Sequence, residues 1–286
     1  MGFIFAAALC SVWVSILLKI AKQQGYQPLE MISWNYLSAS FLCLLWFQPD
    51  FSHISVIHTP WWLILALGIA LPSIFLCLSQ SLSHAGILKT EIAQRLSVIL
   101  SLTAAYFIFN ESFNSLKLLG VVLGLVAIAL ILYSHRGDQE STSSTSGLKY
   151  LVLVWFGYAF IDVLLKYTTG LGLQFAVALN LMFICAFVLS LLFIRVKYQT
   201  WGSGKNILAG LMLGCFNFAN IALYVKAHLL LKDSPAIVFA GMNILVVVFG
   251  VLVGVVFFQE KLKQSSVLGL IFALLSVFCL AFAMSR

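Results

Sequence analysis

Charged residues are what this sequence has least of. Only 9% of its 286 residues are charged, whereas 62% are hydrophobic and the mean hydropathy is +1.07. A soluble domain of this length needs far more charge to cover its surface, so a soluble fold is excluded. The hydrophobic excess must face lipid, and the sequence therefore predicts an integral membrane protein.

Several functional signatures are absent as well. The sequence has no GxxxxGK(S/T) phosphate-binding loop, which argues against ATP as an energy source, and it has no HExxH or GxSxG motif. Its five histidines do not cluster, its six cysteines form no CxxC pair, and its net charge of +7 includes no basic run. We therefore expect no enzyme activity, no metal or other cofactor, and no nucleic-acid partner.

Long apolar runs dominate what is present. A hydrocarbon core of ~30 Å is crossed by about 20 apolar residues in a helix. About ten such runs occur, which predicts an all-α integral membrane protein with that number of transmembrane helices. The runs are 2–20, 31–47, 61–81, 87–109, 115–134, 148–167, 173–195, 206–227, 235–258 and 265–284.

The longest polar stretch divides the chain near its middle. Ser134–Gly147 reads SHRGDQESTSSTSG and contains no apolar run, so we predict a polar linker at residues 135–147. Residues 1–134 and 148–286 then each hold five predicted helices. Because five is odd, two related units of this kind cross the membrane in opposite senses, which makes an inverted repeat of the sort found in secondary transporters.

Matching residues in the same order support this repeat. Each match alone is weak, but their common order along both halves is not expected by chance. The matched pairs are Lys19 and Lys166, Asn35 and Asn180, Gly68 and Gly214, and Glu111 and Glu260.

The endings of the two halves carry a family resemblance. Residues 107–132 read FIFNESFNSLKLLGVVLGLVAIALIL, and residues 257–283 read FFQEKLKQSSVLGLIFALLSVFCLAFA. An apolar helix, a Glu, a polar turn and a Gly-containing last helix resemble the ten-helix, EamA-like branch of the drug/metabolite transporter superfamily. The resemblance implies a multi-pass transporter of small metabolites or drugs in the plasma (inner) membrane, in many members an exporter. It further implies a central cavity, with the runs 115–134 and 265–284 at the periphery.

The most informative polar residues lie in the run 87–109. Arg95 is about eight residues into this helix, which is ~12 Å from its start and close to the membrane midplane. Glu91 is four residues earlier on the same face, so the two side chains can pair, and Gln94 flanks them. Either Arg95 lines the cavity and binds substrate, with Glu91 as counter-ion or proton acceptor, or the two form a structural ion pair.

Other charges near helix ends have two interpretations. Asp162 and Lys166 also stand four residues apart, and Lys19 is equivalent to Lys166 in the repeat. They are candidates for coupling or charge recognition. The alternative, favoured for the lysines, is that they reach the lipid headgroups by snorkelling.

A polar face is predicted on the run 206–227. Asn217, Asn220 and Tyr224 are spaced by three and four residues, so they share one side of the helix. A polar face in lipid must look inward, toward either a substrate or a neighbouring helix. The remaining candidates for the substrate-binding site are Asn35, Asn180, Asn243 and Trp13.

The charge balance favours an anionic or zwitterionic substrate such as an amino acid or organic acid. Arg95 and three lysines outnumber Glu91 and Asp162 around the expected cavity, and the run 2–20 contains no acid. The alternatives are a multidrug exporter of cations or, with less support, an intramembrane enzyme or scaffold. We expect as partners a small-molecule substrate, a coupling ion such as H⁺ and membrane lipids, and a monomer can suffice because the chain already holds two halves.

The orientation in the membrane stays open at this stage. Counting Lys and Arg by side places most of them opposite the termini, which by the positive-inside rule puts the termini outside the cytoplasm. The family resemblance implies cytoplasmic termini instead.

Overall fold

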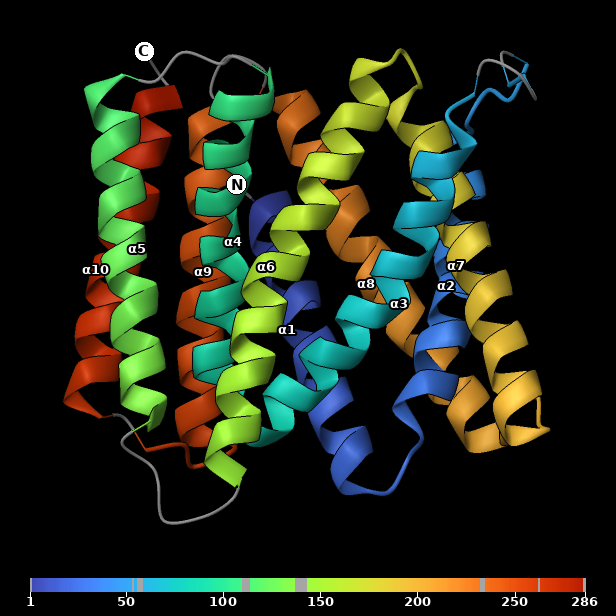
Figure 1. The fold of residues 1–286 in the computed structure, drawn as a ribbon, viewed down its shortest axis with the longest axis horizontal. Coiled ribbons are helices and arrows are strands. Elements are labelled where there is room, and N and C mark those ends of the chain that lie inside the picture. The colour runs from blue at the N-terminus through green and yellow to red at the C-terminus, as the bar shows by residue number, and fades with distance from the viewer. Residues whose placement is uncertain are drawn as a thin grey trace.

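The computed structural model of the chain describes residues 2–52, 54–55, 59–109, 114–136, 143–231, 235–261 and 263–284. Within these ranges the protein consists of ten α-helices and contains no strand (Figure 1). The helices are α1 (Gly2–Gln23), α2 (Pro28–Phe47), α3 (Trp61–His84), α4 (Ile87–Phe109), α5 (Ser115–Arg136), α6 (Ser143–Gly170), α7 (Phe175–Tyr198), α8 (Gly204–Leu230), α9 (Pro235–Val256) and α10 (Gln264–Met284).

The predicted all-α membrane fold is confirmed. Among the described residues, nine helices are long and apolar enough to cross a membrane. The tenth, α2, is interrupted by Glu, Ser, Asn and Trp residues along its length, and it packs between α7 and α8 in the bundle. The helices correspond one to one to the predicted runs, so hydropathy and length are sufficient to find them.

The predicted polar linker is shorter than residues 135–147. Helix α5 extends to Arg136 and α6 begins at Ser143. Ser and Thr residues are well suited to the first turn of a helix, where their side chains can bind free backbone N–H groups, so the polar composition did not end the helix. The division of the chain into two domains at this linker stays a prediction.

The helices run alternately up and down, and both chain ends lie in the upper half of Figure 1. We call this the terminus side; α6 and α8 end there and α7 and α9 begin there. The opposite face is the linker side, where α1 and α3 end and α4 and α8 begin. Helices α1 and α6, the first of each half, therefore run in opposite directions.

The most extensive helix contacts are symmetric: if each helix is replaced by its counterpart in the other half, the same pairs of helices are in contact. Helix α1 packs against α8 and α9, while its counterpart α6 packs against α3 and α4. Helix α2 likewise packs against α8, and its counterpart α7 packs against α3, while three further pairs join counterparts directly: α2 with α7, α4 with α9, and α5 with α10. This pattern is the one that an inverted repeat produces, and it places α5 and α10 together at one end of the molecule (Figure 1).

Small residues allow the closest helix contacts. Helix α8 turns Gly210 and Gly214 toward α2, where an added Cβ would meet the backbone carbonyls of Met31 and Asn35. Between α5 and α10, the Ser276 hydroxyl of α10 donates a hydrogen bond of 2.6 Å to the Gly120 carbonyl of α5. Close backbone approach supplies the van der Waals contact that holds helices together in lipid.

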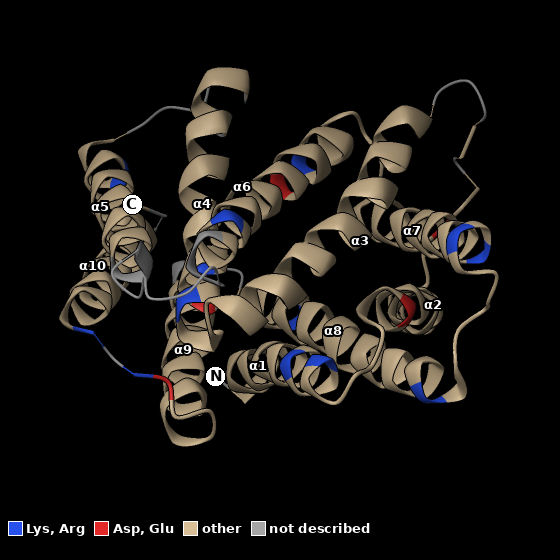
Figure 2. Cartoon of the chain, turned by 60° about the horizontal axis from the view of Figure 1, so that its bottom comes forward, with Lys and Arg blue, Asp and Glu red and all other residues tan. Residues whose placement is uncertain are grey.

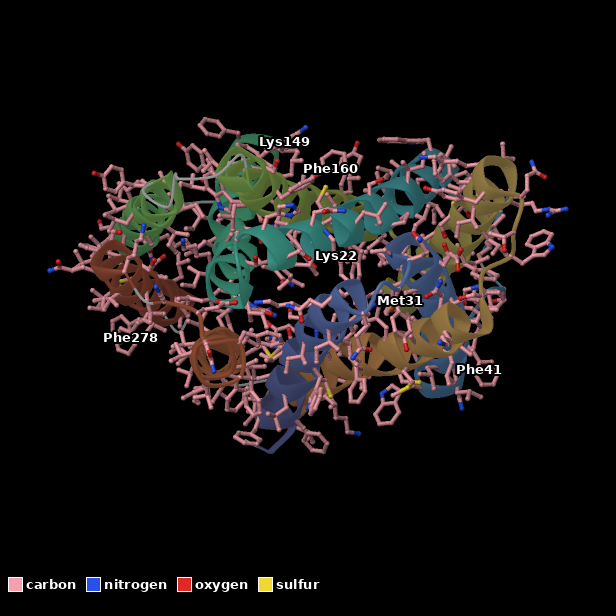
Figure 3. The ribbon with its side chains drawn as sticks, turned by 90° about the horizontal axis from the view of Figure 1, so that it is seen from below. Lys22, Met31, Phe41, Lys149, Phe160 and Phe278 are labelled. Atoms are coloured by element: carbon pink, nitrogen blue, oxygen red, sulfur yellow. The ribbon has the colours of Figure 1, made fainter. Side chains whose placement is uncertain are left out.

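The outer surface is apolar and sparsely charged. Figure 2 shows long uncharged stretches on the helices. Viewed from the linker side, Phe41, Phe160 and Phe278 lie on the rim of the bundle and Lys22 lies among the helix ends near its centre (Figure 3). Each of the three phenylalanines is more than half exposed, as expected for side chains that face lipid.

The close α2–α8 contact predicts that added side-chain volume at Gly214 destabilises the protein. The Gly214→Ala substitution places a Cβ 2.5 Å from Ser38 Oγ and against the Asn35 carbonyl, and backbone cannot yield cheaply. We expect overpacking to cost about 1–3 kcal/mol and to lower the melting temperature of the detergent-solubilised protein. The control is Gly204→Ala on the same helix, where an added Cβ meets nothing within 4 Å. Equal melting temperatures for the two variants would contradict this account.

Candidate functional site

The centre of the bundle contains a cavity of about 700 Å³. Side chains of α1, α3, α4, α6, α7, α8 and α9 line it, whereas α5 and α10 contribute none. Peripheral positions of α5 and α10 were expected from the family resemblance. The volume falls in the range of small-molecule binding sites.

The cavity extends from the middle of the membrane to the terminus side. On α8 it is lined from Asn217 to Leu229, one residue before the helix ends on that side. On α4, which starts on the linker side at Ile87, the first lining residue is Gln94. On α7, which starts on the terminus side, Phe175 at the first position already lines it. The linker-side turns of α1, α3, α4 and α8 thus close the cavity below.

Two hydrogen bonds, one helical turn apart, connect α4 to α1. Arg95 Nη2 donates to Ser11 Oγ at 2.6 Å. One turn toward the linker side, Ser15 Oγ donates to Glu91 Oε1. Because Ser11 and Ser15 are four residues apart on α1, as Glu91 and Arg95 are on α4, the two antiparallel helices match position for position.

The predicted ion pair between Glu91 and Arg95 is not formed. No hydrogen bond or ion pair joins these two described side chains, since each turns to a serine of α1 instead. Glu91 is 1% exposed, and its Oε2 has no hydrogen-bond partner within the described part of the chain; the same holds for Arg95 Nε. A buried charged group without its full set of partners is unusual. Arg95 lines the cavity, where a ligand can supply the missing partner, whereas Glu91 does not line it.

Asp162 of α6 brings a second charge into the cavity. Its side chain lines the cavity with Arg95 and Gln94, is exposed to that space, and accepts a hydrogen bond of 3.1 Å from Ser101 Oγ of α4. Lys166, one turn further along α6, is exposed and does not line the cavity. An exposed position near the end of a helix, such as that of Lys166, is where a snorkelling lysine is expected.

The predicted polar face of α8 does look inward. Asn217, Asn220 and Tyr224 all line the cavity, and Asn243 of α9 joins them. Asn217 also donates 3.2 Å to Asn35 Oδ1, while Asn220 Oδ1 is buried without a partner among the described residues. The structure therefore places the four side chains where a ligand could meet them.

Three further predicted substrate-binding residues, besides Glu91, do not line the cavity in this structure. Asn35 is fully buried behind Asn217, and Asn180 donates to the Ser40 carbonyl at 2.9 Å, so both join helices instead. Trp13 is 47% exposed on the outer face of α1 and stacks on Phe216 at 6.1 Å between ring centroids. Trp13 stands two positions from Ser11 and from Ser15, so it lies on the opposite side of the helix and points to lipid, which composition alone could not reveal.

Sequence reasoning missed the apolar lining. Aliphatic, aromatic and methionine side chains form most of the wall, and they have no signal in the sequence that separates them from ordinary core residues. The aromatic and methionine side chains among those missed are Phe75, Tyr158, Phe175, Met182, Phe183, Phe239 and Met242. His228, near the terminus-side end of α8, also lines the cavity. Among the residues described, no group of His, Cys, Asp and Glu side chains is arranged to hold a metal ion.

Lys19 is not the snorkelling lysine that its place near the helix end predicted. It is 7% exposed, and its Nζ lies 2.6 Å from Glu260 Oε1. Around it, Lys22 Nζ donates to Gln80 Oε1, and Ser81 Oγ lies 2.8 Å from Thr90 Oγ1. These contacts join α1, α3 and α4 on the closed linker side. Glu111, which the predicted repeat matches with Glu260, lies outside the described residues.

The closed linker side can be tested with thiol labelling. In a variant with the six native cysteines replaced, Val225→Cys places a thiol on the cavity wall near the terminus side. We expect a membrane-impermeant maleimide to label it quickly from that side and slowly from the other. The control is Ser81→Cys, at a position 0% exposed on the linker side, which should react slowly from both sides. Faster labelling of Val225→Cys from the linker side would contradict the described opening.

Comparison with known proteins agrees with this architecture. A solved crystal structure that is 13% identical covers 98% of both chains with a TM-score of 0.57, which shows a similar fold and no more.

Two further comparisons concern ancestry. An uncharacterized protein of Haemophilus influenzae is 36% identical over 281 residues, which span 96% of this chain and 95% of the relative. The profile of the EamA-like transporter family matches residues 1–133. Like that family, this chain is a multi-pass membrane protein, here with a central cavity that seven helices line. The chain belongs to the EamA-like transporter family, a part of the drug/metabolite transporter superfamily.

Proposed function

We propose that the protein is a secondary transporter that exports a small anionic or zwitterionic metabolite, such as an amino acid or organic acid, across the plasma (inner) membrane. The single observation that carries this proposal is the Arg95 guanidinium. It lines the cavity near mid-membrane, it is fixed by Ser11, and its Nε lacks a partner among the described residues. A substrate carboxylate supplies the missing acceptor and can bind an arginine through two parallel bonds.

Asp162 makes a zwitterion the better substrate. It shares the cavity with Arg95 and is exposed to that space, so it can receive an ammonium group while Arg95 holds a carboxylate. Asn217, Asn220 and Asn243 supply neutral donors and acceptors nearby. The aromatic and methionine wall then suits an apolar side chain.

Glu91 is the proposed proton-coupling residue. It is a buried carboxylate with one oxygen that lacks a partner among the described residues, and an unpaired charge of this kind is costly in a membrane. The charged and titratable groups that act on it are Arg95 on its own helix and Tyr158 on α6. Other partners in this proposal are membrane lipids, and a monomer suffices because both halves belong to one chain.

A cation exporter is the second candidate. It is favoured by the same Asp162 carboxylate, which shares the cavity with several aromatic side chains able to hold an organic cation. This alternative predicts that quaternary ammonium compounds compete with the transported substrate and that removal of Arg95 does no harm.

The role of Arg95 is tested by counterflow of labelled amino acids and organic acids in proteoliposomes. We expect Arg95→Ala to reduce counterflow to background and Arg95→Lys to retain a part, about one-tenth of the wild-type rate, because lysine cannot form the two parallel bonds. The control is Lys149→Ala, an exposed residue on the rim of the bundle (Figure 3). Undiminished flux in Arg95→Ala, with folding intact, would move the site elsewhere, first to the asparagines of α8.

The role of Glu91 is tested by imposed pH gradients. In the wild type, we expect a proton gradient to drive accumulation of the substrate. In Glu91→Gln, accumulation should no longer respond to the gradient, whereas counterflow at equal pH should continue because substrate exchange needs no net proton movement. The comparison variant is Asp162→Asn, which should weaken substrate binding yet leave the pH response in place. Wild-type flux that ignores the gradient would exclude proton coupling.

A further inference from the structure

One carboxylate, that of Glu260, ties together three segments on the linker side. Glu260 lies between α9 and α10, in the second half of the chain. Its Oε1 accepts from the backbone N–H of Ile87 at 2.6 Å and from Lys19 Nζ at 2.6 Å. Its Oε2 accepts from the N–H of Leu88 at 3.1 Å. The second half of the chain thereby holds the start of α4 and the end of α1, both in the first half.

Two glycines leave the space that this carboxylate occupies. An added Cβ at Gly86 would lie 2.7 Å from Glu260 Cδ, and one at Gly254 would lie 2.9 Å from Oε2. Gly86 also has a φ of +89°, a conformation that other residues rarely adopt. The Glu260 backbone N–H donates 2.9 Å back to the Gly254 carbonyl, and Lys19 Nζ lies 4.2 Å from the centre of the Phe258 ring. We call this arrangement the Glu260 socket.

The three bonds that Glu260 accepts in the socket are strong together, and they can all be broken together. The two N–H groups belong to the free first turn of α4, where the helix dipole favours an anion, and Lys19 adds an opposite charge. Hydrogen bonds to charged groups are among the strongest in proteins. All three depend on one side chain, so a single movement of the α9–α10 segment breaks every one of them together.

Helix α4 connects this socket to the substrate cavity. Arg95 stands eight residues after Ile87, or ~12 Å along a continuous helix. Glu91 lies between them, and Gly250 of α9 approaches it so closely that an added Cβ would be 3.0 Å from Glu91 Cγ. The helix that carries Arg95 into the cavity is therefore the one that the socket holds.

We propose that Glu260 is the gate residue of the linker side: its bonds to Lys19 and to the start of α4 keep the cavity closed there, and their release opens it. This inference rests on the proposed function for its purpose, since a gate matters to a transporter. The geometry of the gate itself does not depend on which substrate is carried.

The chain offers a matched comparison in Glu30. This carboxylate of α2 also caps a helix on the linker side, accepting from the Ser203 N–H at 2.9 Å and from Asn206 Nδ2 at 2.7 Å at the start of α8. No lysine or arginine of the described residues forms an ion pair with it. It holds α8 and not α4, so it has the same chemistry as Glu260 in a place where no gate is proposed.

The gate is tested by thiol accessibility without any substrate. The probe is a membrane-impermeant maleimide added to the linker side of vesicles that contain the cysteine-free protein with Ser81→Cys, a buried position bonded to Thr90 of α4. We expect Glu260→Gln to raise the labelling rate about tenfold, because a charge-assisted bond and an ion pair are lost. Glu30→Gln should leave the rate within about twofold of the parent, since its bonds do not reach α4.

A second variant keeps every charge in place. Gly254→Ala displaces the Glu260 carboxylate from its socket by volume alone and should raise labelling in the same direction. Its monodispersity and melting temperature in detergent establish that the protein folds. Unchanged labelling in both Glu260→Gln and Gly254→Ala, or an equal rise in Glu30→Gln, would overturn the gate.

Transport measurements separate this inference from the proposed function. Faster labelling together with a lower maximal counterflow rate and an unchanged KM supports both. Faster labelling in a protein that moves none of the amino or organic acids supports the gate and refutes the proposed substrates. Normal labelling in a protein that transports them refutes the gate alone.

Discussion

The exclusion of water from the membrane is the constraint on which this structure depends. A polar or charged side chain within the bilayer must find a partner in another helix or border a cavity, because no solvent is available to it. Many of the polar groups described in the helices follow this rule. Lys19 binds Glu260, Asn180 binds the Ser40 carbonyl, and Ser276 binds the Gly120 carbonyl, each across a helix boundary. Among the buried polar atoms that lack a partner in the described residues, those of Glu91, Arg95 and Asn220 lie at or beside the cavity, whereas those of Tyr36 and Ser79 do not line it.

Helix α4 concentrates these contacts. Its first turn is held by Glu260, Glu91 and Arg95 bind serines of α1, and the Leu96 carbonyl accepts 3.0 Å from Trp155 Nε1 of α6. Contacts with both halves of the chain therefore set its position. Displacement of the first turn of α4 on the linker side would therefore also move the part of the helix that lines the cavity. A hydrogen-bonded helix moves as one body, because it is far stiffer along its axis than the loops that flank it.

Much of the fold could be predicted from the sequence, since lipid imposes a simple rule on segment length and hydropathy. The inward face of α8 followed from spacing alone, because Asn217, Asn220 and Tyr224 share one side of a helix that lipid would not accept. The partners of charged residues could not be predicted. Glu260 is 241 positions from Lys19, and Ser11 and Ser15 resemble any small residues in a transmembrane helix. Distance along the chain and the neutral appearance of serine conceal contacts that only the packed helices bring together.

The two ends of the cavity differ chemically at positions that the predicted repeat makes equivalent. Glu30, which caps α8 on the closed side, stands five residues before Asn35; the position five residues before the matched Asn180 is Phe175. Phe175 lines the cavity at the start of α7 on the open side. A carboxylate that fastens two helices thus has a hydrophobic ring as its counterpart, and a ring cannot cap a helix. Exchange of the conformations of the two halves would therefore not interchange equal states, because the carboxylate cap at this position exists on the linker side and not at the start of α7.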